Sequence, residues 1–100
     1  MAWASAYIEK LRAGEPVSFR PRGHSMSGKI DSGQLCTVEP VDPSTLRAGD
    51  IVLCKVNGRE YLHLIKAIQG ERFQIGNDRG RINGWVLAGS IFGLCVKVES

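Results

Sequence analysis

One serine and two histidines are the residues of this chain that could carry out nucleophilic catalysis. Ser25 stands in the stretch RGHSM, directly after His24, while His63 stands in the apolar stretch YLHLIKAI, which also contains Lys66. A serine hydroxyl is a weak nucleophile and needs a base within hydrogen-bond reach and donors for the developing oxyanion. A buried, uncharged histidine can be that base near neutral pH, whereas a lysine first needs its pKa lowered by burial.

The alternation of side chains along an extended strand separates these candidates. Neighbouring residues point to opposite faces, so His24 should face away from the Ser25 hydroxyl. On the strand expected over residues 59–68, His63 and Lys66 lie on opposite faces unless a bulge intervenes. By spacing alone, a serine and a histidine that are 63 − 25 = 38 residues apart favour structural roles for both.

The composition predicts one small folded domain over residues 1–100. Hydrophobic residues make up 43% of the chain, and no apolar run approaches the roughly 20 residues that span a bilayer. We therefore expect no signal peptide, no membrane span and a cytoplasmic protein. The three widely spaced cysteines favour reduced thiols over disulfides or a zinc site, so no metal and no cofactor is expected. A net charge of +3 makes nucleic acid an unlikely partner.

The spacing of apolar residues predicts a mostly β domain that follows one N-terminal helix. An amphipathic pattern over residues 3–13, closed by Gly14, indicates the helix. Short alternating segments predict a β domain over residues 17–98, and Asn-Gly at 57–58 predicts a tight hairpin between two of its strands. The glycine-rich stretch NDRGRINGW, residues 77–85, is interpreted as a loop.

The order of short motifs resembles the signal peptidase and LexA superfamily of serine peptidases. The matching pieces lie between residues 17 and 98 and are GHSM (23–26), IDSGQLCTV (30–38), LRAGDIVL (46–53), YLHLIKAI (61–68), GND (76–78) and IFGLCVKV (91–98). The resemblance implies a LexA/signal-peptidase-like small β-sheet or barrel domain. It also implies a soluble serine peptidase that cleaves an extended peptide by acyl-enzyme chemistry, the peptide binding as an added strand.

The resemblance assigns Ser25 as the nucleophile and His63 as the general base. LexA-type repressors and bacterial leader peptidases carry a lysine at the base position, and archaeal and endoplasmic-reticulum signal peptidases carry a histidine there. The residue that orients His63 is Asp78 or Asn83, both in the stretch that follows the base strand. An asparagine can fix the tautomer by hydrogen bonding but stabilises an imidazolium less than a carboxylate does.

Gly23 and Met26 flank the nucleophile and are the expected substrate-binding residues, although Met26 could also pack behind Ser25. Backbone N–H groups at Ser25 and its neighbours are the expected oxyanion donors. The motif lacks the family's proline after the serine, and Gln34 replaces an acid. These departures favour an alternative, a non-catalytic LexA-like β-module that binds a protein partner. By analogy, the C-terminal strand over residues 90–98 could form a homodimer.

Overall fold

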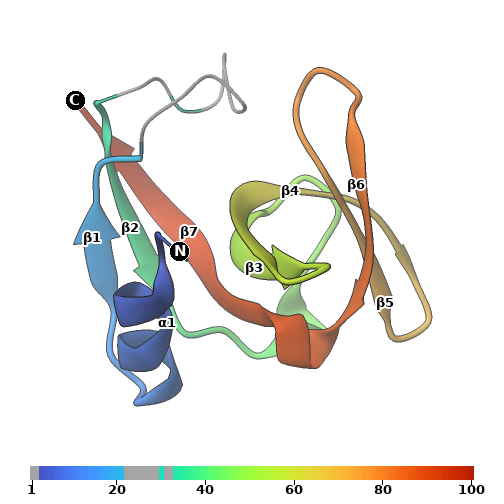
Figure 1. Ribbon diagram of the computed structural model, residues 1–100, viewed down its shortest axis with the longest axis horizontal. Coiled ribbons are helices and arrows are strands. Elements are labelled where there is room, and N and C mark those ends of the chain that lie inside the picture. The colour runs from blue at the N-terminus through green and yellow to red at the C-terminus, as the bar shows by residue number, and fades with distance from the viewer. Residues whose placement is uncertain (1–2, 22–29, 31–32) are drawn as a thin grey trace.

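The computed structural model describes residues 3–21, 30 and 33–100, and its strands form one antiparallel sheet with one α-helix (Figure 1). This confirms the mostly β fold with an N-terminal helix. The predicted residues Gly23, Ser25 and Met26 lie outside the described residues. The elements are α1 (Ser5–Arg12), β1 (Val17–Phe19), β2 (Leu35–Glu39), β3 (Ile51–Val56), β4 (Arg59–Gln69), β5 (Arg72–Gly76), β6 (Ile82–Leu87) and β7 (Ile91–Glu99), with short 3-10 turns at Pro43–Thr45 and Ala88–Ser90.

The strand order of the seven-stranded sheet is β1-β2-β7-β3-β4-β5-β6. The C-terminal strand β7 therefore joins β2 to β3, while β1 and β6 are the edges. Figure 1 shows α1 beside β1 and β2, with β5 and β6 on the other side of the molecule.

The prediction of a loop over residues 77–85 is wrong for residues 82–85, because these residues belong to strand β6, which begins at Ile82. Gly84 has a φ of +148°, and a Cβ there would lie 3.1 Å from Cγ1 of Val56 on β3. A glycine therefore lets β6 pass close to β3. The glycine that suggested a loop is in fact the feature that lets this strand curl over the core.

Strand β3 separates two buried clusters. Leu53 belongs to the first, which α1 covers, and Val52 and Cys54 belong to the second, which lies among β3, β4, β5 and β6. The three side chains are fully buried, as the apolar sequence IVLC predicts for a strand with both faces covered. The predicted hairpin is confirmed: Asn57 and Gly58 have φ values of +50° and +81°. This turn sets the register that places His63 opposite Val52.

Helix α1 is held at its N-terminus by Glu60 of β4. No side chain of the helix caps its first turn. Instead the buried Glu60 carboxylate accepts hydrogen bonds from the backbone N–H of Ala4 (2.6 Å) and from the Ser5 hydroxyl (3.2 Å). The indole N–H of Trp3 donates to the Glu60 backbone oxygen (3.1 Å). A carboxylate from a distant strand thus supplies the negative group that a helix N-terminus favours.

We predict that Glu60→Ala lowers the free energy of unfolding by about 2–3 kcal/mol, because it leaves the buried Ala4 N–H without an acceptor. Urea unfolding of the variant measures the loss. Glu71→Ala is the matched control, since Glu71 is an exposed turn residue, and it should change stability by less than about 0.5 kcal/mol. Equal effects of the two substitutions would show that Glu60 does not anchor the helix.

Candidate active site around His63

Strand β4 runs from the molecular surface into the protein interior, where His63 lies opposite Val52 of the second buried cluster. Arg59, Tyr61 and His63 lie on one face of the strand, and their exposure falls in that order from exposed through half-buried to buried. His63 is 5% exposed. The Tyr61 ring stacks on the imidazole with centroids 4.9 Å apart and an interplanar angle of 28°. The imidazole is therefore held on one side by an aromatic ring.

A bulge in β6 directs Asn83 at His63. Ile75 of β5 pairs with Gly84 and Gly76 pairs with Ile82, so Asn83 is the extra residue between two ladder pairs. Such bulges redirect a side chain that regular alternation would place elsewhere. Here Oδ1 of Asn83 lies 2.9 Å from Nδ1 of His63.

The bond to Asn83 fixes the tautomer of the imidazole. A carbonyl oxygen only accepts, so Nδ1 of His63 carries the hydrogen and donates it to Asn83 Oδ1. The neutral ring then keeps a lone pair on Nε2. This is the arrangement in which a histidine can accept a proton from a hydroxyl.

The surroundings of His63 favour its neutral form. Burial lowers the pKa of the imidazole below its ordinary value of 6.5, and the positive charge of Arg81 lowers it further. The hydrogen bond to Asn83 and the negative charge of Asp78 act in the opposite direction without cancelling the effect of burial. His63 is therefore an uncharged base at neutral pH.

Asn83 makes the hydrogen bond to Nδ1, and Asp78 acts on His63 through its charge. One carboxylate oxygen of Asp78, Oδ1, is buried and makes no hydrogen bond within the part of the chain that the structure describes. The sequence left these two residues open as alternatives. No motif could separate them, because the choice depends on the bulge in β6.

Lys66 supports the loop that leads to Asn83. Its Nζ donates to the backbone oxygen of Asn77 (3.1 Å), whose side-chain Oδ1 accepts from the backbone N–H groups of Arg79 and Arg81 (2.9 Å each). A Cβ added at Gly76 would lie 3.0 Å from Cγ of Lys66, on the face of the Gly76 partner Leu64 and opposite His63. The register of β4 shifts between Ile65 and Ala67, so Lys66 lies at a bulge, and sequence reasoning identified neither the bulge nor the loop contact.

The described residues on either side of the predicted nucleophile lie close to one another. The backbone N–H of Gly33 donates to the Pro21 oxygen (3.4 Å), and Nη1 of Arg20 donates to the Gly33 oxygen (2.6 Å). Ile30 is 3% exposed and belongs to the first buried cluster with Leu62 and Leu64, whose side chains lie on the face of β4 opposite His63. The roles of Ser25, Gly23 and Met26 stay predictions.

The cysteines are poor alternative nucleophiles. All three are free, as the sequence predicts. Burial is the main cause that raises the pKa of Cys36 and of Cys54 to about 12, and it also raises the pKa of Cys95. A thiol attacks as its thiolate, so these side chains are largely unreactive at neutral pH.

Three further expectations from the sequence concern a metal site, a membrane span and a homodimer. Among the described residues, no group of three or more histidine, cysteine or acidic side chains could hold a metal ion, and no helix is long and apolar enough to cross a membrane. The second half of β7 pairs with β2 and leaves Val96 and Val98 exposed. The homodimer through this strand stays a prediction.

Comparison of the chain with models of known protein families gives no match, and comparison with curated proteins gives none either.

The lowered pKa of His63 predicts a pH-dependent stability. The unfolded chain protonates this ring near pH 6.5, whereas the folded chain does so only at lower pH. Between these two pKa values the unfolded state binds more protons than the folded state does. The free energy of unfolding is therefore highest above about pH 6.5 and falls as the pH drops toward the pKa of His63 in the folded protein. Urea unfolding at a series of pH values should show this loss in the wild type and a smaller loss in His63→Gln. The same slope in both proteins would contradict burial of a neutral His63.

Proposed function

We propose that this chain is a serine peptidase in which Ser25 is the nucleophile, His63 is the general base and Asn83 orients the imidazole. The observation that carries the proposal is the Asn83–His63 hydrogen bond, because it places the hydrogen on Nδ1 and the lone pair on Nε2 of a neutral, buried ring. The bulge in β6 brings an amide oxygen to Nδ1, which satisfies the buried N–H and fixes the tautomer that a general base requires. The resemblance of the serine and base motifs to the signal peptidase and LexA superfamily supports the same assignment.

The reaction follows from the properties of these groups. The Ser25 hydroxyl attacks the carbonyl carbon of an extended peptide while Nε2 of His63 accepts the hydroxyl proton. Backbone N–H groups beside Ser25 stabilise the oxyanion, and the imidazolium then protonates the leaving amine. Water, deprotonated by His63, releases the acyl group from Ser25 in the second half of the reaction.

Asparagine at position 83 limits how well the site stabilises the imidazolium form of His63. A neutral amide holds the tautomer but stabilises the imidazolium less than a carboxylate would. The negative charge of Asp78 supplies part of the missing stabilisation, since it raises the pKa of His63. We therefore expect slow catalysis. The rate should be highest at pH values where His63 is neutral and should fall with decreasing pH below pH 6.5.

Cleavage of a decapeptide library by the wild type and by Ser25→Ala tests the proposal. Mass spectrometry of the products should show a defined set of cleavages in the wild type that Ser25→Ala reduces at least about 1,000-fold. Traces of equal intensity in both proteins would assign the activity to a contaminant. A wild type that binds peptides and cleaves none would instead support the non-catalytic module.

A further inference from the structure

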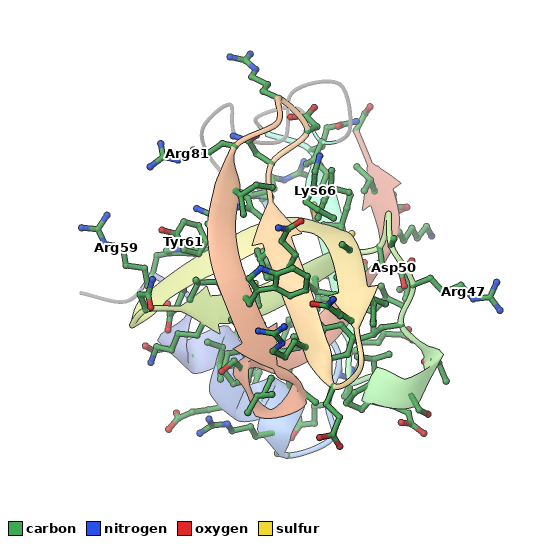
Figure 2. All side chains as sticks on the ribbon, turned by 90° about the vertical axis from the view of Figure 1, so that its right-hand side faces the viewer. Arg47, Asp50, Arg59, Tyr61, Lys66 and Arg81 are labelled. Carbon is green, nitrogen blue, oxygen red and sulfur yellow. The ribbon has the colours of Figure 1, made fainter. Side chains whose placement is uncertain are left out.

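Arg59, Arg81 and Tyr61 lie on the same side of the molecule (Figure 2), and we call them the basic rim. Arg59 and Tyr61 precede His63 at two-residue intervals on one face of β4, a spacing of about 6.8 Å per pair in an extended strand. Arg81 precedes the bulged Asn83 by two residues, and its charge acts on His63. Figure 2 shows Arg59, Tyr61 and Arg81 on one side of the molecule and Arg47 on the opposite side.

Among the described residues, no ion pair joins Arg59 or Arg81 to an acid, although Asp78, whose negative charge also acts on His63, lies in the same loop as Arg81. Arg59 and Arg81 are exposed, and the ion pair found within the described part of the chain joins Lys97 to Glu99 at the C-terminus. The acid next to Arg59 in sequence, Glu60, points to the other face of β4, where it holds helix α1. The two guanidinium groups are therefore available to an acidic ligand.

An extended peptide fits this side of the molecule better than a nucleic acid does. The neighbouring edge strand β6 reads INGWVL, contains no charged residue, and pairs only with β5 among the strands that the structure describes. Such an edge can form backbone hydrogen bonds with an added peptide strand. The two-residue period of that peptide would match the period of Arg59, Tyr61 and His63. Nucleic-acid binding instead favours a broad basic surface, and the net charge of the chain is only +3.

We propose that the basic rim selects extended peptides with acidic side chains near the bond held at His63. This inference rests on the proposed peptidase function and names the substrate class of the same site. Arg59 and Arg81 each bind one carboxylate of the peptide, on residues that flank the scissile bond. Tyr61 lies between the exposed Arg59 and the buried imidazole and forms the apolar contact in this row.

Binding of matched peptide pools to Ser25→Ala tests the selection without requiring cleavage. The probes are fluorescein-labelled decapeptide pools in which one position at a time is Glu, Gln or Lys, and fluorescence anisotropy gives the dissociation constants. At low salt, the preferred Glu pools should bind about three- to tenfold more tightly than the matched Gln pools, and the Lys pools should bind most weakly. The difference between Glu and Gln should shrink as salt is added.

Charge-matched variants assign this preference to the basic rim. Arg59→Gln/Arg81→Gln, made in the Ser25→Ala background, should bind the Glu and Gln pools equally. The controls are the single variant Arg47→Gln, which removes a positive charge on the opposite side of the molecule and should keep the preference, and circular dichroism, which should show unchanged folding in every variant. Equal binding of the Glu, Gln and Lys pools would overturn the proposal, as would an equal loss in Arg47→Gln.

Two further readouts separate this inference from its alternatives. Oligothymidylate that displaces the Glu pools at a lower concentration than an unlabelled Glu pool would identify a nucleic-acid surface and overturn the peptide proposal. Wild-type cleavage of the same pools distinguishes the two proposals. Cleavage with no preference for Glu would refute the acidic selection alone, whereas selective binding without cleavage would refute the peptidase function alone.

Discussion

His63→Gln should reduce peptide cleavage at least about 1,000-fold in kcat/KM. Glutamine has no group that can accept the Ser25 proton and later return it to the leaving amine. Because the imidazole is buried beside Tyr61 and bonded to Asn83, no other described side chain is placed to replace it. Initial rates on one peptide from the library measure the loss, and urea unfolding confirms that the variant is folded.

Lys66→Gln is the matched comparison for this prediction, because Lys66 is the other candidate base on β4. Glutamine at position 66 keeps a hydrogen-bond donor on a side chain one bond shorter than that of lysine, so the substitution weakens the contact with the Asn77 backbone oxygen and leaves His63 unchanged. We expect this variant to lose less than about tenfold in rate. The reverse pattern, with Lys66→Gln inactive and His63→Gln active, would assign the base to the lysine.

Substitutions of Asn83 should separate orientation of the imidazole from stabilisation of its charge. In Asn83→Leu, Nδ1 of His63 loses its acceptor and the tautomer is no longer fixed, so kcat/KM should fall about 100-fold or more. In Asn83→Asp, a carboxylate accepts the same hydrogen bond and stabilises the imidazolium. The pKa of His63 should then rise by about one unit or more, and the acid limb of the pH–rate profile should move to higher pH.

The pH profile distinguishes a positioning role from a purely structural one. If Asn83 only maintained the fold, Asn83→Asp would change the rate at all pH values by one factor and leave the acid limb in place. Nitrogen NMR of the His63 ring gives a second readout. It should show the hydrogen on Nδ1 in the wild type and in Asn83→Asp, and a mixture of tautomers in Asn83→Leu.

Much of the fold could be predicted because local patterns and tertiary packing agree. The amphipathic spacing around Ile8 and Leu11 predicts α1, the Asn57-Gly58 turn sets the β3–β4 hairpin, and alternation along β4 places Tyr61 on the face of His63. Each of these signals is confined to a few residues in sequence. The structure satisfies all of them together.

The features that the sequence did not reveal depend on residues far apart in the chain. Gly84 suggested a loop because glycine is common in turns, and the nearby sequence does not show that a Cβ there would press against Val56 on another strand. A glutamate at position 60 is typical of an exposed strand residue. It is buried only because the start of α1, at Ala4, 56 residues earlier in the chain, packs against it. The choice of Asn83 over Asp78 at Nδ1 depends on a one-residue bulge, which no local pattern specifies.

The most direct test of the account is the site and rate of covalent modification by a fluorophosphonate. The Ser25 oxygen attacks phosphorus, fluoride leaves, and His63 takes the hydroxyl proton, so labelling reports both the nucleophile and its base. Peptide mapping by mass spectrometry should place the label on Ser25, and His63→Gln should slow labelling about 100-fold or more. A label at another residue, or labelling of Ser25 at the same rate in His63→Gln, would contradict the proposed Ser25–His63 mechanism.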